Sequence, residues 1–361
     1  MSTIWFMKGF SNLYHAIADL KNADIDGNFK VLCTHINKSF VGFESADFFE
    51  VEPTSTDQEF LIFCKEMIVK YKVKVIFASN KQYLLSKNSK FFKSLGVEVV
   101  TAASYRMINN INNKAKLYKL LENNGVVNIP DFMTFSNDKE FEEAYKTLKK
   151  QHQQLCMKPV QGVYGVGFYV LKEKTNQLKN VLNQDQVVSV RALKSMFANK
   201  KFHKMMMMQF LEGAERSVDC VAYKGEFIGG VIRKKMTGNL PQLIEDNPAL
   251  IEQARFLTKK LKLNGMFNIQ FKDYGGEHYL LEINPRLSGR SFYATIAGLN
   301  LPYVASLVFS GMKKPSEINW ELKKNLLISA VNAPVISTKN FLKIEELNTN
   351  HFIKNENEES K

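Results

Sequence analysis

LCMKPVQGVYGVGFYVL, residues 155–171, places a lysine at the end of one apolar strand and three glycines in the turn to the next strand. Gly162, Gly165 and Gly167 let the backbone adopt φ > 0 and bring its N–H groups against a polyanion. Lys158 adds a charge that can reach a phosphate. The segment joins strand to strand and is not a GxxxxGK[ST] loop. It predicts a flap over a phosphate-bearing ligand, although a plain hairpin turn has the same pattern.

A second informative stretch is MFNIQFKDYGGEHYLLEINPRLSGR, residues 266–290. Apolar and polar residues alternate on both sides of a glycine turn, which predicts a β-hairpin. With the turn centred on Gly275, odd-numbered residues of both strands share the apolar face, and Gln270, Glu282 and Asn284 share the polar one. One carboxylate with two amides suits Mg²⁺ better than Zn²⁺ or Ca²⁺, provided that phosphates and water supply the other ligands.

Together these stretches resemble the ATP-grasp ligases, with an order and spacing similar to the synthetase halves of carbamoyl phosphate synthetase. The matching features are Lys114, KPVQGVYGVG, the strand MMQFLEGAERSVD and the hairpin from Gln270 to EINPR, all within Lys114–Pro302. Biotin carboxylase and the D-alanine ligases share this plan but usually carry Glu where Gln270 stands. The 361 residues contain no glutaminase domain, second synthetase half or biotin-carrier segment, so we do not expect carbamoyl phosphate synthesis itself. More loosely, IWFMKGFSNLYHAI and the chain length resemble stand-alone ATP-grasp proteins associated with bacterial tellurite-resistance-type stress operons.

The resemblance implies roles for residues of a nucleotide site. Lys114 is implied to lie near the α-phosphate, although an exposed lysine in a first helical turn is also ordinary. Glu215 matches the acid at the ribose, with Asp219 as the alternative. The strand implied to line the adenine comprises Met208, Gln209, Phe210 and Leu211. The implied cofactors are ATP and Mg²⁺, with Mn²⁺ as an alternative.

Arginines complete the predicted site. Arg286 directly follows the hairpin and can stabilise charge on a phosphoryl group in transfer, together with Lys158 and Lys114. Arg290 and Arg233 are candidates for holding the carboxylate of the acceptor. For both of them the alternative is a surface or structural ion pair.

The chain divides into four predicted segments. Residues 1–104 alternate strand-like and helical runs, which predicts βαβ units and a small parallel sheet whose loops form one wall of the substrate site. Residues 105–204 are expected to form one ATP-grasp lobe with the flap, and residues 205–338 a second lobe with the hinge strand and metal site. Nucleotide is expected between these two α+β lobes. Residues 339–361 form a charged tail that we expect to be disordered.

Expected local elements follow from periodicity and end signals. Strands are expected at 3–7, 29–34, 73–78 and 97–100, and helices at 11–21, 57–71, 82–95 and 113–124. Residues 291–312 carry no charge, but Gly298, Asn300 and Pro302 interrupt them. This pattern predicts a short helix beginning at Pro302 rather than a membrane span.

Composition is that of a globular two-part enzyme, with 45% hydrophobic and 24% charged residues. Four widely spaced cysteines without a CxxC motif predict free, buried thiols in a reducing cytoplasm. Lys8 and Gly9 interrupt the apolar N-terminus, so we expect no cleaved signal. The net charge of +13 is dispersed and accompanies no RNA- or DNA-binding motif, which favours an anionic substrate over nucleic acid. The sequence leaves open whether the protein forms a homodimer.

These features predict an ATP- and Mg²⁺-dependent ligase. It would phosphorylate a small carboxylate and let an amine or another nucleophile displace the phosphate. The alternative is a nucleotide-binding sensor or assembly protein without turnover. The retained set of Gln270, Glu282, Asn284 and Arg286 favours the enzyme, because a sensor has no physical need for a metal site.

Overall fold

The computed structural model describes residues 1–162, 165–176, 179, 180, 183, 185–236, 241–331 and 333–337. Two residues of the predicted flap, Val163 and Tyr164, and the predicted tail at 339–361 lie outside these residues. Contacts divide the chain into two compact units. Unit one comprises residues 1–108, 218–268 and those from 285 onward, and unit two comprises residues 109–217 and 269–284. The division at 104, 204 and 338 stays a prediction.

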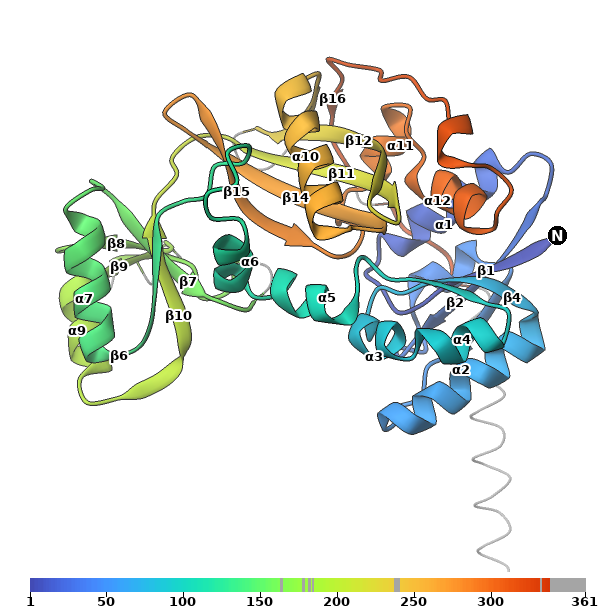
Figure 1. Ribbon diagram of the computed structural model, residues 1–361, viewed down its shortest axis with the longest axis horizontal. Coiled ribbons are helices and arrows are strands. Elements are labelled where there is room, and N and C mark those ends of the chain that lie inside the picture. The colour runs from blue at the N-terminus through green and yellow to red at the C-terminus, as the bar shows by residue number, and fades with distance from the viewer. Residues whose placement is uncertain are drawn as a thin grey trace, which may run out of the picture. The chain divides into compact units, whose positions relative to one another are not determined.

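Five parallel strands form the N-terminal sheet of unit one, in the order β3-β2-β1-β4-β5 (Figure 1). They are β1 (Ser2–Phe6), β2 (Phe29–His35), β3 (Phe48–Val51), β4 (Val73–Phe77) and β5 (Glu98–Val100). The predicted small parallel sheet is confirmed. Because the strand order reverses between β1 and β4, the carboxyl ends of these strands border the crevice where such sheets bind ligands.

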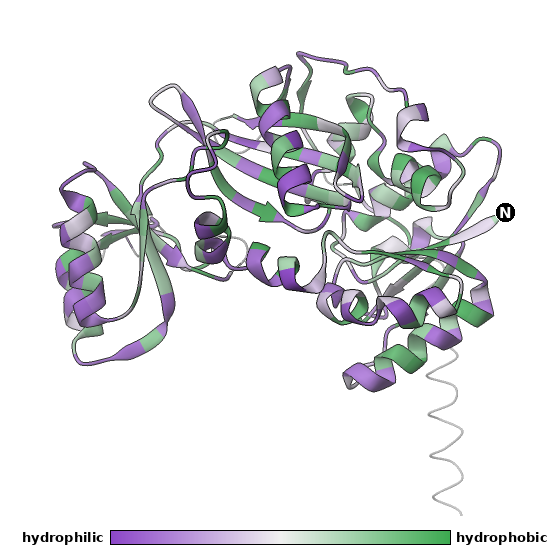
Figure 2. Ribbon diagram, viewed as in Figure 1, coloured by the Kyte–Doolittle hydropathy of each residue, from purple (hydrophilic) through white to green (hydrophobic). Residues whose placement is uncertain are grey.

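Both faces of this sheet are covered, and its central strands β1 and β4 are mostly apolar (Figure 2). On one face Ile4 and Phe6 belong to a core with helices α1 (Leu13–Ala23) and α12 (Leu301–Phe309). On the other face Trp5 packs with helix α2 (Asp57–Tyr71). Alternation along β1 therefore assigns successive residues to different cores.

Helix boundaries follow from side-chain caps. α2 begins after Thr56, whose side chain accepts from the N–H of Glu59 while the Glu59 carboxylate accepts from the N–H of Thr56. The single helix expected at 82–95 is wrong: the structure has α3 (Gln82–Lys87) and α4 (Ser89–Ser94). Asn88 lies between the two helices, and both its backbone N–H and its side chain donate to the carbonyl of Leu84.

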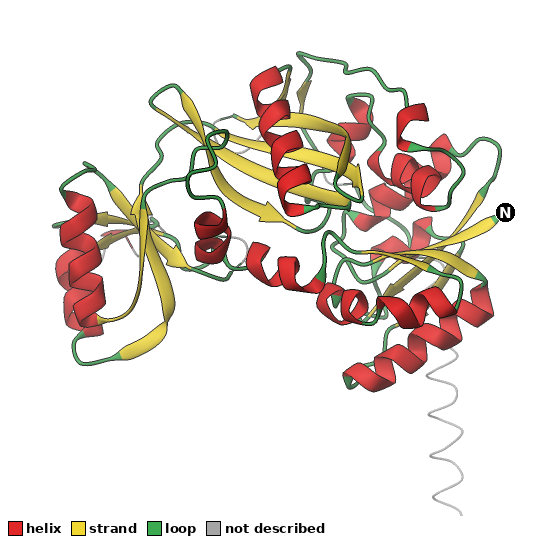
Figure 3. Cartoon of the chain, in the orientation of Figure 1, coloured by secondary structure: helices red, strands yellow, loops and turns green. Residues whose placement is uncertain are grey.

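A six-stranded sheet has the order β15-β14-β11-β12-β13-β16, and β11 and β14 pass along the chain from one unit to the other. Helix α10 lies along β12 (Figure 3). The strands are β11 (Glu215–Tyr223), β12 (Glu226–Lys235), β13 (Gln242–Glu245), β14 (Gly265–Tyr274), β15 (Glu277–Asn284) and β16 (Leu327–Ile328). The remaining elements outside unit two's own sheet are η1 (Val41–Ser45), α5 (Tyr105–Ile111), α10 (Pro248–Leu261), α11 (Phe292–Ile296) and η3 (Pro315–Glu317).

Unit two has its own five-stranded sheet, in the order β6-β10-β7-β8-β9. β7 and β8 pair antiparallel, with Cys156 opposite Val170, so the glycine loop joins strand to strand as predicted. A core that includes Phe135, Phe141 and Leu193 packs α7 and α9 on this sheet (Figure 1). The elements are α6 (Lys114–Leu120), β6 (Phe132–Asn137), α7 (Asp138–Lys149), β7 (Leu155–Pro159), β8 (Tyr169–Lys172), β9 (Val187–Ser189), α9 (Val190–Phe197) and β10 (Lys201–Gln209).

The predicted hairpin is present as β14 and β15, joined by two glycines with φ of 59° and 87°. The expected assignment of faces is only partly correct. In β14 the odd-numbered Phe267, Ile269 and Phe271 are buried as expected. In β15 the buried residues are Leu280 and Ile283, whereas Tyr279 and Leu281 are only half-buried. A two-residue turn at Gly275 and Gly276 pairs odd with even positions, so odd-numbered residues of the two strands do not share one face.

The uncharged segment 291–312 folds as two short helices, α11 and α12. The side chain of Asn300 accepts from the N–H of Tyr303 and caps α12. The helix therefore begins at Leu301, one residue before the predicted start at Pro302. Over the described ranges, no helix combines the length and apolarity that crossing a membrane requires. The four cysteines are free and buried, as predicted.

Candidate functional site

Three elements of unit two bring Lys114, Lys158 and Glu282 together from distant parts of the sequence. Lys114 is the first residue of α6, where the side chain of Asn113 caps the helix. Its backbone N–H donates to the carbonyl of Val160, just past β7, at 2.9 Å. Its ammonium lies 3.1 Å from Oε2 of Glu282 on β15. The predicted site residues of these three elements therefore form one cluster.

The charges of this cluster perturb one another. Burial lowers the pKa of Lys158 to about 8, and the positive charge of Lys114 contributes to the same effect. Glu282 and Glu215 act in the opposite direction on the pKa of Lys158, which places Glu215 within electrostatic range. Burial alone would raise the pKa of Glu282, but Lys114, Asn284 and Lys158 hold it below its usual value. Glu282 is therefore ionised at neutral pH.

Glu282 and Asn284 point to the same side of β15, because Nδ2 of Asn284 donates to Oε1 of Glu282 at 3.1 Å. Gln270 lies half-buried on β14, and its part in a metal site stays a prediction. The described residues include no cluster of three or more His, Cys, Asp or Glu side chains that could hold a metal. The donor set nevertheless fits Mg²⁺ bound with phosphates. The ammonium of Lys114 shows that the Glu282 carboxylate accommodates a cation.

The glycines of the flap differ in their roles. Gly165 and Gly167 have φ of 68° and 77°, as expected for a tight loop of this kind. A Cβ at Gly167 would lie 2.9 Å from the side chain of Pro159, so the loop also requires glycine there for space. The expectation of φ > 0 is wrong for Gly162. Its carbonyl instead accepts a hydrogen bond from the ammonium of Lys114 at 3.1 Å.

The predicted adenine strand is the end of β10 and the residues after it. Met208, Gln209 and Leu211 are buried. The N–H of Gln209 donates to the carbonyl of Asp131, and the N–H of Phe210 donates to the carbonyl of Gln154, both at 3.0 Å. These two N–H groups are therefore occupied, and the backbone of Leu211 is the better candidate for reading an adenine edge.

Two residues of this region were not anticipated from the sequence. Tyr118 is completely buried on α6, its hydroxyl donates to the carbonyl of Leu281 at 2.7 Å, and its ring centre lies 5.9 Å from Nζ of Lys158. It follows Lys114 by four residues, so helical spacing would have placed both on one face. The ammonium of Lys272 lies 5.8 Å from the ring centre of Phe210, a contact that gives no local sequence signal.

In unit one, Arg233 is the centre of a buried polar network. Its Nε donates to Oδ2 of Asp219 at 2.6 Å, Nη2 donates to Oγ of Ser288 at 2.9 Å, and Nη1 donates to the side chain of Gln242. Asn268 donates to the other carboxylate oxygen of Asp219 at 2.9 Å. This is the structural ion pair that the sequence left open, and binding of a substrate carboxylate by Arg233 stays a prediction. Asp219 is committed to this network, which favours Glu215 as the ribose ligand.

The two other predicted arginines, Arg286 and Arg290, come after β15 in the chain and belong to unit one. Arg290 donates through Nη1 to the hydroxyl of Tyr293 at 3.0 Å. The guanidinium carbon of Arg286 lies 4.5 Å from the ring centre of Phe10. Their roles toward a phosphoryl group or a carboxylate stay predictions.

Comparison with known proteins identifies the fold. Residues 201–348 match the sequence model of a family described as ATP-grasp in the biosynthetic pathway with Ter operon. The carbamoyl phosphate synthase large chain of Clostridium acetobutylicum is 24% identical over 290 residues, 75% of this chain and 25% of that protein. N5-carboxyaminoimidazole synthetase from Staphylococcus aureus, complexed with ADP, superposes with a TM-score of 0.63 and 13% identity over 89% of this chain and 80% of its own. The chain has the ATP-grasp fold.

A further structural neighbour of this ATP-grasp protein is an L-amino acid ligase from Bacillus licheniformis. It has a TM-score of 0.58 and 15% identity, and the match covers 85% of this chain and 74% of that chain. These likenesses confirm the predicted fold class. The ATP-grasp protein spans about a quarter of the length of the carbamoyl phosphate synthase that it matches, so the reaction of that protein does not transfer to it.

Proposed function

We propose that this ATP-grasp protein is an ATP- and Mg²⁺-dependent ligase that activates a small carboxylate. The observation that carries the proposal is the cluster in unit two, where Lys114, Lys158 and the carboxylate of Glu282 meet. Two ammonium groups and a cation-binding carboxylate suit a bound nucleoside triphosphate with its metal. The ADP complex of the Staphylococcus aureus neighbour supports the same ligand.

The residues of the cluster have distinct tasks. Lys158 and Lys114 would bind phosphate oxygens, and Glu215 the ribose. Glu282, with amide oxygens of Asn284 and Gln270, would hold Mg²⁺, which neutralises charge on the phosphates when it is bound. When nucleotide binds, the ammonium of Lys114 would leave the Glu282 carboxylate and contact a phosphate instead, since both partners are anions. The flap glycines would let the backbone approach the phosphates. This exchange prepares the site only when nucleotide and metal arrive together.

The chemistry is positioning and charge stabilisation. A carboxylate oxygen of the acceptor attacks the γ-phosphorus, the bond to the β-phosphate oxygen breaks, and ADP leaves. An amine or another nucleophile then attacks the acyl phosphate and displaces phosphate. Arg286 is two residues beyond Asn284 in the chain, so covalent geometry keeps their backbones within about 7 Å of each other. Arg286 would therefore be able to stabilise charge on the phosphoryl group in transfer. The reducing cytoplasm is the proposed location, given the free thiols.

The test measures release of ADP and phosphate from Mg²⁺-ATP over a panel of small carboxylates and amines. Glu282→Ala removes the carboxylate of the proposed metal site, so turnover should fall by orders of magnitude while the fold persists. Glu277→Ala is the matched control, since Glu277 is an exposed carboxylate on the same strand. Acceptor-dependent ADP release that is equal in both variants would reject the assignment. A panel with no release above Glu282→Ala would favour a sensor without turnover.

A further inference from the structure

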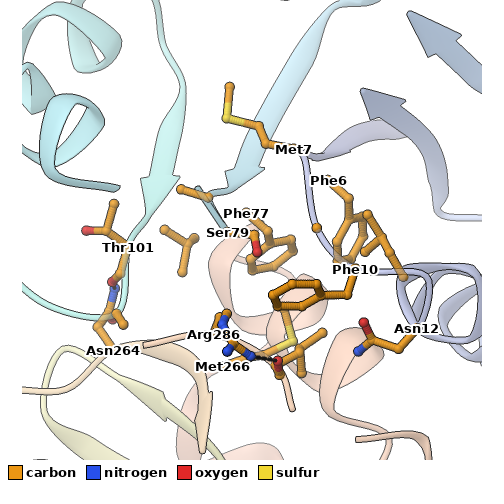
Figure 4. A pocket seen from close by; sticks show the side chains of 16 residues that line it. Phe6, Met7, Phe10, Asn12, Phe77, Ser79, Thr101, Asn264, Met266 and Arg286 are labelled. Atoms are coloured by element: carbon orange, nitrogen blue, oxygen red, sulfur yellow. Dashed lines mark hydrogen bonds between the residues drawn. The ribbon is translucent and has the colours of Figure 1, made fainter. Parts of the chain in front are cut away.

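A pocket in unit one lies at the carboxyl ends of β1, β4 and β5, where the order of the parallel sheet reverses (Figure 4). Its cavity volume is about 40 Å³, which is room for a short alkyl group behind the open mouth. This position is where open α/β sheets bind their ligands. We call it the switch-point pocket. None of the unit-two cluster lines it.

The floor of the switch-point pocket is apolar. The rings of Phe6 and Phe77 lie 5.1 Å apart between centroids, and both side chains are buried. Val100 and Met266 extend the same floor. Such a floor stabilises a ligand by excluding water from an apolar group.

The mouth carries an aromatic ring and a cation. Phe10 is 38% exposed, so folding leaves much of this ring in water. The guanidinium carbon of Arg286 lies 4.5 Å from its centre, and Figure 4 shows both side chains among the lining residues. A guanidinium matches the two oxygens of a carboxylate, and the adjacent ring supplies apolar contact. The mouth thus suits an anionic head next to an apolar body.

The other polar groups of the lining restrict the chemical class of the ligand further. Of the four neutral polar side chains in the lining, three already bond to the protein and the fourth is that of Ser79. The three are Asn12, which donates to the Ser288 carbonyl, Thr101, which donates to the Ala103 carbonyl, and Asn264, which donates to the Thr101 carbonyl. The lining includes no Asp or Glu. A ligand with an ammonium group or a second carboxylate would therefore bury a charge without a partner.

We propose that the switch-point pocket binds the acceptor acid, and that this acid is a monocarboxylate with an uncharged apolar substituent. Arg286 pairs with its carboxylate, and the substituent enters between Phe10 and the floor. This inference rests on the proposed ligase function, because it names the substrate class of that reaction. Zwitterionic amino acids, dicarboxylates and nucleotides are excluded from the pocket by its charge pattern.

Binding of defined acids to the full chain without nucleotide tests the pocket independently of catalysis. Calorimetry or ligand-observed NMR should give affinities that rise about fourfold per methylene from acetate to pentanoate, until the pocket is full. 4-Methylpentanoate should bind at least about tenfold more tightly than leucine, which has the same skeleton plus an ammonium group. Butanoate should likewise bind more tightly than succinate, which has the same chain length and a second carboxylate.

Two variants locate the binding. Gly9→Ala adds one methyl in ordinary contact with Leu13 and Ser79, at 3.4 Å and 3.7 Å, so it fills the pocket without a clash. It should weaken pentanoate and 4-methylpentanoate several-fold and leave acetate unchanged. Arg286→Gln should weaken every acid by about tenfold, because the charged contact is common to all. Mg²⁺-ATP should raise the melting temperature of Gly9→Ala as much as that of the wild type. This control shows that the variant is folded.

Equal affinities for 4-methylpentanoate and leucine, or no effect of Gly9→Ala on the larger acids, overturn the substrate class. Release of ADP with a polar acid that does not respond to Gly9→Ala would keep the ligase function and reject the pocket. Binding of apolar acids without any ADP release would keep the pocket and reject the ligase.

Discussion

Replacing Lys158 with methionine should make the nucleotide-free protein more stable. Burial and the nearby Lys114 lower the pKa of Lys158 from 10.5 to about 8, so the folded state penalises its charge. A fall of that size corresponds to about 3 kcal/mol of unfolding free energy, an upper bound for the gain at pH 7. Methionine keeps an unbranched apolar stem for packing and removes the charge.

The pH dependence has a defined sign. Between pH 8 and pH 10.5 the unfolded chain keeps the Lys158 proton and the folded chain releases it, so unfolding takes up a proton. The unfolding free energy of the wild type should therefore rise through this interval relative to Lys158→Met, and the two should converge near its upper end. Below pH 8 both states carry the charge, and the full difference should persist.

Bound nucleotide should reduce this difference in stability between Lys158→Met and the wild type. Lys158→Met loses a charged contact to phosphate, so the affinity for Mg²⁺-ATP should fall by about 1–3 kcal/mol. Denaturant unfolding across pH, with and without Mg²⁺-ATP, and ATP titration calorimetry measure both effects. Lys116→Met is the control, because Lys116 is an exposed lysine on the same helix as Lys114. A variant that is less stable than the wild type at pH 7, or that binds ATP equally well, refutes the argument.

Three further outcomes are expected. Mg²⁺-ATP should raise the melting temperature, because at 100-fold excess over Kd it adds about 2.7 kcal/mol to the free energy of unfolding. Mg²⁺ alone should leave the melting temperature unchanged. An absence of ATP binding in calorimetry at millimolar concentrations would contradict the site. Gly165→Val should reduce turnover more than ATP affinity, because a β-branched residue resists the φ of 68° at this position; a pure loss of melting temperature would instead indicate a simple turn. Arg233→Met leaves Asp219 buried without its cation and should cost about 3–5 kcal/mol in denaturant unfolding, whereas an unchanged midpoint would show that the network is not structural.

The elements that periodicity predicts well are those whose ends carry local signals. The helix expected at 57–71 has these bounds, because Thr56 and Glu59 form a capping box within four residues of sequence. The β-hairpin of β14 and β15 was likewise predictable from alternation around a double glycine. Such signals depend on neighbours in the chain, and they survive without knowledge of the rest of the fold.

Features that depend on long-range packing were not predictable. The change of buried face along β15 needs the register of β14, and Arg233 acquires its role from partners 9 to 55 residues away. Tyr118 reaches a carbonyl 163 residues distant. A single sequence contains no record of which distant groups meet, so both alternatives for Arg233 had equal standing before the structure.

The sequence by itself was sufficient to predict the ATP-grasp fold, because the glycine flap and the EINPR hairpin are contiguous motifs. Only the tertiary structure decided that Lys114 pairs with Glu282, and that an apolar pocket with one cation at its mouth lies where the parallel sheet reverses. Both depend on surfaces contributed by separate elements. The distances between such surfaces follow from packing of the whole chain rather than from any local pattern.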